Sequence, residues 1–360
     1  MTQAPVIVGA GPAGSAAAIA LCRRGIAPTL IDRNAVAGDA ICGGFLSWRT
    51  AQTLRTLCID PLALGAKEVR QLRLFTSRRT VRTRLPDTAY GLSRHALDQA
   101  MRNRAVAVGA KLIVDTVQGF EPGRVLGDNR SYAAETIFHA SGKHDVRGAS
   151  RPRDPEHTAI GIRVRTPPNS AATEAIGDAI ELHLFEGGYA GIVVQEDGSA
   201  NVCLAVRKNL LSRSGGRPLE LLHRLAEENP HFATRIVSLP AHVPVDTIGS
   251  VPYGFIASDT QPGVFRLGDQ AAVIPSLAGE GMSIAVHSGL AAADAWSKHG
   301  RCGAEAYQRA FAARVERPVS IAGLAWRMGE DEMLSEWMMR AAGWAPWLAG
   351  AVMRATRLAA

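Results

Sequence analysis

The chain has 360 residues, of which 47% are hydrophobic and 20% are charged, and it carries a formal net charge of +7. This composition is typical of a folded globular protein with about two domains, and it excludes a disordered chain. The longest apolar stretch lies between Arg340 and Arg354 and is shorter than the roughly 20 residues that a membrane-spanning helix requires. The sequence therefore predicts a folded protein without a transmembrane span.

Cysteine usage and the first residues bear on the cellular compartment. The five scattered cysteines form no CxxC pair, which disfavours both a disulfide framework and a zinc site. The first residues, MTQAP, lack the basic region of a secretory signal. We therefore expect a cytoplasmic protein with no metal site.

The first predicted elements surround a glycine-rich turn. Residues 6–8 (VIV) predict a short buried strand, residues 9–14 (GAGPAG) the turn, and the small residues that follow a helix ending at Gly25. Residues 29–32 (TLID) predict a second strand that ends in Asp32. This order of strand, turn, helix and strand is typical of a βαβ dinucleotide-binding unit.

Each glycine of the turn has its own physical task. Gly9 permits the tight turn, Gly11 lets the backbone approach a pyrophosphate, and Gly14 allows close packing of the helix on the strand. The helix N-terminus offers free N–H groups and a positive dipole end to phosphates. Asp32 is placed to bind ribose hydroxyls, which favours an unmodified adenosine ribose over a 2′-phosphate. The turn therefore predicts a dinucleotide, either FAD or NAD.

Arginines alternate with apolar residues over residues 69–85. That spacing predicts a two-stranded hairpin with one solvated face and a turn near SRR. Nucleic-acid binding is disfavoured because no nucleic-acid motif accompanies the arginines, while steering of an anionic cofactor or substrate stays open. Further along, residues 179–208 predict antiparallel strands joined at EGG and EDGS.

A second glycine-containing cluster separates FAD from NAD. A strand (VFRL) leads to Gly268 and Asp269, and a Gly-Glu-Gly sequence then opens a long helix of small residues. The ribityl hydroxyls of a flavin need an acceptor such as Asp269, and its electron-rich pyrimidine edge is stabilised by a helix N-terminus, here around Gly281 and Met282. An ordinary NAD dehydrogenase needs no such second site, so the sequence favours FAD.

Four segments together resemble a known family. They are GAGPAG at residues 9–14 followed by Asp32, LSRHALDQAM at residues 92–101, HASGKHDVRG at residues 139–148 and LGDQAAVIPSLAGEGM at residues 267–282. In this order they resemble the motifs of the FAD-dependent para-hydroxybenzoate hydroxylase superfamily, including its geranylgeranyl-reductase-like branch. The resemblance implies an α/β fold with a Rossmann-like FAD-binding domain, an interleaved antiparallel-sheet substrate domain and a C-terminal helical segment.

The resemblance also implies domain boundaries. The FAD-binding domain is expected at residues 1–65, 86–158 and 246–300, the substrate domain at residues 66–85 and 159–245, and the helical segment at residues 301–360. The FAD-binding domain is thus expected to be discontinuous in the chain.

Cofactor contacts follow from the same resemblance. Arg94 is expected near the chain that links the two halves of FAD, Val117 near the adenine and Gly142 at the central FAD turn. The residues expected to bind FAD are Gly9, Gly11, Pro12, Ala13, Gly14, Asp32, Arg33, Arg94, Val117, Gly142, Asp269, Gly279, Gly281 and Met282.

Two residues are candidates for the chemistry. Residues 39–54 (DAICGGFLSWRTAQTL) resemble the Cys-Gly-Gly segment that runs along the flavin ring in the geranylgeranyl-reductase-like branch, so Cys42 is expected to tune the ring or donate a proton. A small buried hydrophobe is the alternative role for this cysteine. Tyr189 is the second candidate, expected to line the substrate pocket. Gly191 stands where reductases of the branch carry a tryptophan, which departs from the pattern for a prenyl substrate.

The expected function is that of an FAD-dependent oxidoreductase acting on a small hydrophobic organic substrate in a biosynthetic pathway. Two mechanisms stay open: hydride transfer from the flavin to a double bond, with NAD(P)H as electron donor, and monooxygenation through a flavin hydroperoxide. A flavin-dependent halogenase and a flavin-binding protein without turnover are the alternatives.

The C-terminal segment is expected to be helical. Trp337, Trp344 and Trp347 with flanking arginines leave open a peripheral membrane contact or a cover over a hydrophobic tunnel, besides a helix pair packed on the body. Pro346 is expected to start the last helix.

Overall fold

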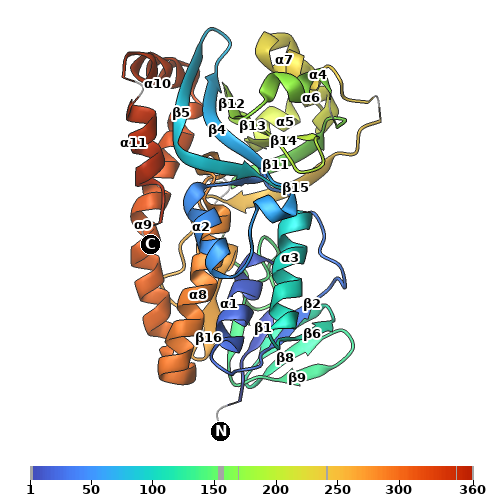
Figure 1. Ribbon diagram of the computed structural model, residues 1–360, viewed down its shortest axis with the longest axis vertical. Coiled ribbons are helices and arrows are strands. Elements are labelled where there is room, and N and C mark those ends of the chain that lie inside the picture. The colour runs from blue at the N-terminus through green and yellow to red at the C-terminus, as the bar shows by residue number, and fades with distance from the viewer. Residues whose placement is uncertain (1–2, 153–157, 169, 241, 346, 359–360) are drawn as a thin grey trace.

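The computed structural model describes residues 3–152, 158–168, 170–240, 242–345 and 347–358. A parallel sheet with its helices forms the lower half of the view in Figure 1, a larger mixed sheet forms the upper half, and the C-terminal helices run along one side of both. The fold is therefore the expected α/β arrangement with a Rossmann-like half, a second sheet and a C-terminal helical segment.

The parallel sheet has five strands in the order β16-β10-β1-β2-β6. They are β1 (Val6–Val8), β2 (Thr29–Asp32), β6 (Lys111–Val114), β10 (Ile137–His139) and β16 (Val264–Arg266). The central strand β1 is buried on both faces, as expected for a parallel sheet that is covered on each side.

Each face of this sheet has its own cover. Helices α1 (Pro12–Cys22), α3 (Arg94–Ala107) and α8 (Gly281–His299) share one apolar cluster with Ile7, Leu30 and Phe265. A small antiparallel sheet of β7 (Val117–Glu121), β8 (Arg124–Gly127) and β9 (Ser131–Ala133) packs with Val6 and Val8 on the other face. Alternate residues of β1 therefore enter different layers, as the pleat of a strand requires.

The larger sheet has eight strands in the order β15-β11-β14-β13-β12-β4-β5-β3. They are β3 (Phe45–Leu46), β4 (Lys67–Phe75), β5 (Thr80–Gly91), β11 (Thr158–Arg165), β12 (Ala179–Phe185), β13 (Gly188–Val194), β14 (Ala200–Val206) and β15 (Asp246–Pro252). The arginine-rich segment forms the antiparallel hairpin β4–β5, and the strands at 179–208 are antiparallel, as their sequence patterns predict.

The two faces of the larger sheet contact different helices. Ile162, Ile192 and Leu204 pack in one cluster with four short helices, which are α4 (Ala171–Ile176), α5 (Lys208–Ser212), α6 (Pro218–Glu228) and α7 (Pro230–Ile236). On the other face, Leu184 and Tyr189 pack against Trp326 of α9 (Ala304–Gly329). This second face is turned toward the C-terminal helices, and we call it the inner face.

The remaining helices link the two halves. They are α2 (Trp48–Thr56), α10 (Glu332–Trp344), α11 (Trp347–Ala355) and the short 3₁₀ turns at Leu62–Leu64, Gly268–Gln270, Ser276–Ala278 and Gly300–Gly303. Pro346, expected to start the last helix, lies outside the described residues, and the division into domains at the stated boundaries stays a prediction. Among the helices of the described ranges, none is both long and apolar enough to span a bilayer.

Candidate functional site

The glycine turn after β1 is closed by backbone atoms on two sides. Gly9 has φ +105°, and a Cβ there would lie 2.3 Å from the carbonyl oxygen of Ala140. A Cβ on Gly14 would lie 1.9 Å from the carbonyl oxygen of Gly9. Contacts this short exclude a side chain, so both positions require glycine to bring the turn against β10 and α1 against β1.

Arg94, the first residue of α3, reaches the same turn. A Cβ on Gly11 would lie 3.7 Å from Nη2 of Arg94. Arg94 also donates to both carboxylate oxygens of Asp98, at 2.8 and 2.6 Å. Burial opposes the positive charge, but the carboxylate of Asp98 outweighs it and raises the pKa of Arg94. A permanent cation therefore stands beside the turn, where it can neutralise a phosphate.

Asp32 is held beside the turn by the backbone. Its Oδ2 accepts a hydrogen bond from the N–H of Ala10 at 2.8 Å, and its Oδ1 accepts one from the N–H of Asn34 at 3.0 Å. Oδ1 also lies 3.2 Å from Nη2 of Arg102, and the Asp32 side chain keeps 16% of its exposure. Because a carboxylate offers about four acceptor positions, Asp32 can still accept a hydroxyl group.

Two further residues expected to bind FAD, Arg33 and Val117, lie beyond Asp32. Nη2 of Arg33 lies 3.1 Å from Nε2 of His144. Val117 begins β7, two residues after Asp115, whose N–H donates to the carbonyl oxygen of Asp32 at 2.9 Å. The fold therefore brings Arg33 and the start of β7 to the carboxyl end of β2.

The second glycine-containing cluster packs directly on α1. Gly268 has φ +58°, and a Cβ there would lie 3.2 Å from Cβ of Ala13. The next residue, Asp269, is half-buried, and its carbonyl oxygen accepts a hydrogen bond from Arg151 at 3.0 Å. The amide of Gln270 donates to the carbonyl oxygen of Gly142 at 2.8 Å. Asp269 is thus tied to the central turn at Gly142.

Helix α8 packs closely against the start of α1. A Cβ on Gly289 would lie 2.3 Å from the carbonyl oxygen of Ala13, so the two helices are in close contact (Figure 1). Both begin at the carboxyl end of the parallel sheet, and their positive dipole ends therefore face the same side. Gly281 opens α8 and Met282 is buried behind it. The first N–H groups of α8 are free to bind an electron-rich group.

These residues fit FAD. The N-terminus of α1 and Arg94 suit a pyrophosphate, and the N-terminus of α8 suits the electron-rich pyrimidine edge of a flavin. The carboxylates of Asp32 and Asp269 suit ribose and ribityl hydroxyls. A Cβ on Gly142 or Gly281 would meet nothing within 4 Å, so both backbone segments are open to close approach. When bound, the flavin supplies the redox chemistry that no side chain can supply.

The Cys42 segment connects the two halves of the protein. Nζ of Lys143, next to the central turn, donates to the carbonyl oxygen of Ile41. Nδ2 of Asn201, on the inner face of the larger sheet, donates to the carbonyl oxygen of Cys42 at 3.0 Å. Cys42 itself is half-buried, and its Sγ accepts the N–H of Gly44 at 3.5 Å. The thiol therefore lies where the FAD-binding half meets the larger sheet.

Tyr189 belongs to an aromatic cluster that the sequence did not predict. Its hydroxyl donates to Oγ of Ser276 at 2.7 Å, and the hydroxyl of Tyr253 contacts the same oxygen. Trp326 packs edge-on against both tyrosine rings, with centroids 5.7 and 5.4 Å apart. Burial raises the pKa of Tyr189 well above its usual value. Tyr189 is therefore a protonated phenol at neutral pH.

Cys203 is a second cysteine on the inner face. It pairs with Gly191 across β13 and β14, and burial raises the pKa of its thiol to about 12. In the sequence, only the alternation of residues along β14 indicates the position of Cys203, because Asn201, Cys203 and Ala205 lie on one face of the strand. Ser276 lies within the LGDQAAVIPSLAGEGM segment, whereas no local pattern marks Tyr253 or Trp326.

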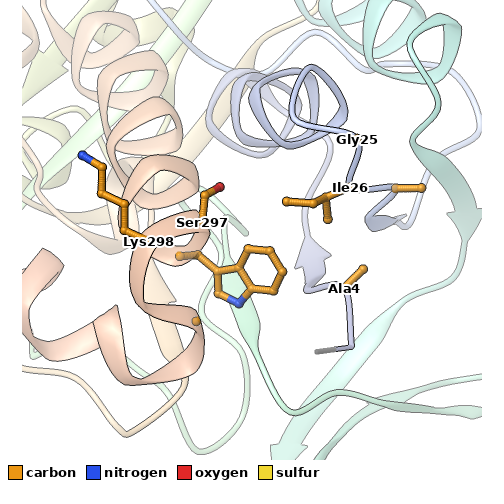
Figure 2. Close-up of a pocket in the computed structure, with 8 residues that line it drawn as sticks. Ala4, Gly25, Ile26, Ser297 and Lys298 are labelled. Atoms are coloured by element: carbon orange, nitrogen blue, oxygen red, sulfur yellow. The ribbon is translucent and has the colours of Figure 1, made fainter. Parts of the chain in front are cut away.

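Two surface hollows among the described residues lie away from this site. The larger, about 530 Å³, lies at the C-terminal ends of α1 and α8 and is lined by residues that include Gly25, Trp296 and Lys298 (Figure 2). The other, about 400 Å³, lies beside Lys67 and Asp178. Helix C-termini carry the negative dipole end, which disfavours a pyrophosphate in the larger hollow.

The fold and the donor set define a flavoprotein, and comparison with known proteins agrees. The family model of an FAD binding domain matches residues 2–147. The chain therefore carries an FAD-binding domain and is an FAD-dependent oxidoreductase, similar in sequence to reductases of the geranylgeranyl-reductase-like kind.

Two of the similar curated sequences are named as reductases. Digeranylgeranylglycerophospholipid reductase 2 of Methanopyrus kandleri is 27% identical over 80% of this chain and 75% of its own length. Menaquinone reductase of Mycolicibacterium smegmatis is 27% identical over 82% of this chain and 76% of its own length.

Similar solved structures confirm the fold. A geranylgeranyl bacteriochlorophyll reductase-like protein of Thermoplasma acidophilum has a TM-score of 0.73 at 19% identity, covering 92% of this chain and 89% of its own. A flavin-dependent brominase has a TM-score of 0.77 at 15% identity, covering 99% and 93%. At these identities the likeness concerns the fold alone.

Proposed function

We propose that the enzyme reduces a carbon–carbon double bond of a hydrophobic substrate in a biosynthetic pathway, with NAD(P)H as the electron donor. One observation carries the proposal: the Cys42 segment is hydrogen-bonded to the central turn on one side and to the inner face of the larger sheet on the other. The Cys42 thiol lies between the FAD-binding half and an apolar face, where it could donate a proton to a carbon atom of the substrate. The reductase names of the similar curated proteins support the same reaction class.

The inner face supports a hydrophobic substrate. Leu184, Tyr189 and Trp326 form one apolar cluster, against which Leu182 packs. A Cβ on Gly191 would already lie 3.6 Å from both Leu182 and Tyr189. A tryptophan at this position would displace both side chains, whereas glycine lets them lie against the sheet.

Saturation of a double bond consumes a hydride and a proton, and this chain offers two proton donors. The thiol of Cys42 is the first, because it lies at the junction of the two halves. The phenol of Tyr189 is the second, because it lies on the inner face and its hydroxyl donates to Ser276 in the loop before α8.

Monooxygenation is the second candidate function, because the buried apolar inner face would also protect an oxygenation reaction from water. An anaerobic experiment separates the two. The purified enzyme is loaded with FAD, reduced with NADPH or dithionite without oxygen, and mixed with a prenylated quinone or an unsaturated polyprenyl phospholipid. Reoxidation by the substrate with a saturated product supports the reductase. In a parallel aerobic assay with the same substrate, consumption of oxygen in equal amount to NAD(P)H, with an oxygenated product, overturns it.

We also propose a peripheral contact of this cytoplasmic enzyme with a lipid surface, through α10 and α11. Trp337, Trp344 and Trp347 are 61%, 93% and 68% exposed. The guanidinium of Arg340 lies 5.4 Å from the ring centre of Trp337, and Arg354 is exposed on α11. Tryptophan with arginine is typical of surfaces that rest at the headgroup level of a bilayer. Such a contact would bring the enzyme to a lipid-like substrate.

A further inference from the structure

The residues after α11 return to the FAD-binding half and end in a buried ion pair. Thr356, Arg357 and Leu358 are 3%, 5% and 1% exposed, and Leu358 belongs to the same apolar cluster as α1 and α8. Arg49 of α2 donates to the carbonyl oxygen of Leu358 at 2.8 Å. Nη1 of Arg357 lies 2.9 Å from Oε1 of Glu280, whose side chain is fully buried. We call residues 356–358 the tail.

Glu280 occupies a sensitive position in the FAD site. It is the N-cap residue of α8, between Gly279 and Gly281. Nη1 of Arg357 also donates to the carbonyl oxygen of Ala278 at 2.7 Å, and its guanidinium lies 4.8 Å from the ring centre of Trp48. The tail therefore contacts the loop before α8 at two points, through Ala278 and through Glu280.

The charge of Glu280 matters because of where it lies. A carboxylate at the first turn of α8 would cancel the positive dipole end that a reduced flavin, which carries negative charge, requires. The groups that face this carboxyl are Arg357, Arg49, Ser47 and Ser283. Burial raises the pKa of Glu280, and the charge of Arg357 acts in the opposite direction. The charges of Glu280 and Arg357 cancel, so the pair adds no net charge at the start of α8.

We propose that Arg357 is a positioning residue for FAD. Its guanidinium neutralises Glu280 and fixes the loop from Ala278 to Gly281, so that the first N–H groups of α8 present a positive potential to the pyrimidine edge of the flavin. The inference rests on the proposed FAD site at the start of α8, and it adds to that site a residue far away in the sequence.

Variants of the pair test the inference through two measurements that need no substrate. They are the dissociation constant for FAD, from flavin fluorescence, and the midpoint potential of the bound flavin between pH 7 and pH 9. Arg357→Met leaves Glu280 unpaired, so we expect FAD to bind at least tenfold more weakly and the potential to move in the negative direction as Glu280 ionises. Glu280→Gln leaves a positive charge, so we expect the potential to move in the positive direction. The double variant of Arg357→Met with Glu280→Gln, and the single variant Arg357→Lys, should have a dissociation constant and a midpoint potential close to those of the wild type.

Opposite signs are the diagnostic result, because a purely structural pair would give the same direction of change in both single variants. Arg317→Met removes an exposed arginine of α9 and should change neither measurement. If Arg357→Met does not fold, Glu280→Gln decides: a potential that does not become more positive overturns the inference. A wild-type chain that does not retain FAD overturns the proposed site itself, and the inference with it.

Discussion

The phenol of Tyr189, on the larger sheet, donates a hydrogen bond to Oγ of Ser276, in the loop before α8, at 2.7 Å. Tyr189→Phe removes this bond and one of the two proposed proton donors. We expect turnover to fall about tenfold, the equivalent of about 1.4 kcal/mol in the barrier. The FAD content of the purified protein should not change. Turnover is measured anaerobically with an unsaturated hydrophobic substrate.

Cys42→Ala tests the first proton donor in the same assay. A general acid contributes about 10²-fold or more to a rate, so we expect a loss of about that size, larger than that of Tyr189→Phe. Cys203→Ala is the matched control, since it removes a thiol on the inner face that is not one of the proposed proton donors. A loss in Cys203→Ala equal to that in Cys42→Ala would mean that the effect comes from packing rather than from proton transfer.

Asp269 is expected to accept a hydrogen bond from a ribityl hydroxyl. Asp269→Ala should therefore weaken FAD binding about tenfold or more, since a hydrogen bond to a charged group contributes about 1.5–3 kcal/mol. The measurement is a fluorescence titration of the apoprotein with FAD. Asp294→Ala is a suitable control because Asp294 lies on α8 and pairs with Lys298 at its exposed end. Equal affinity of Asp269→Ala and wild type would remove Asp269 from the site.

The parts of the site with a fixed local spacing could be predicted from the sequence. The strand, GAGPAG turn and helix follow from one continuous segment, Val6 to Cys22, and the structure shows why Gly9 and Gly14 admit no side chain. The alternating arginines also predicted the β4–β5 hairpin, because a period of two is visible in a single segment.

The parts that depend on distant segments could not be predicted. The side chain of Ser276 is hydrogen-bonded to the hydroxyl groups of Tyr189, on β13, and of Tyr253, in the chain after β15. Trp326 of α9 packs edge-on against both tyrosine rings. The pairing of Arg357 with Glu280 likewise joins residues 77 positions apart. No periodicity records such contacts, because they are set by how the C-terminal helices pack on the two sheets.

A buried charge cluster in the larger sheet gives a prediction about stability. Glu181 is fully buried and lies 2.7 Å from Nε of Arg235 and 3.2 Å from Nη1 of Arg73. Burial opposes ionisation, but hydrogen bonds from His183 and Arg235 outweigh it and lower the pKa of Glu181 from 4.5 to about 2. Glu181→Gln should lower the free energy of unfolding at pH 7 by about 3 kcal/mol or more, because it leaves buried guanidinium groups without their partner.

The pH dependence of that effect has a definite sign. A carboxyl whose pKa is lowered in the folded state stabilises it above the ordinary pKa, and this contribution is lost as the pH falls from 4.5 toward about 2. Urea unfolding of wild type and Glu181→Gln should therefore differ at pH 7 and converge below pH 4.5. Glu220→Gln changes an exposed carboxylate of α6 and serves as control. A difference that stays constant down to pH 2 would assign the effect of Glu181→Gln to packing.

The exposed tryptophans give a prediction about lipid surfaces. Trp344 and Trp347 lie at the junction of α10 and α11, 93% and 68% exposed. Burial of a large apolar side chain contributes about 1.5–3 kcal/mol, so the double variant Trp344→Ala/Trp347→Ala should bind vesicles of phosphatidylglycerol and phosphatidylcholine at least tenfold more weakly in a sedimentation assay.

The same assay distinguishes binding by the tryptophans and their flanking arginines from nonspecific binding by exposed apolar side chains. Val237→Ala removes an exposed apolar side chain on the opposite side of the larger sheet and should leave vesicle binding unchanged. Because Arg340 and Arg354 flank the tryptophans, we expect binding to weaken in high salt and with vesicles of phosphatidylcholine alone. Binding that is the same in the double variant and the wild type would show that these tryptophans do not contact lipid, and their exposure would then require another partner.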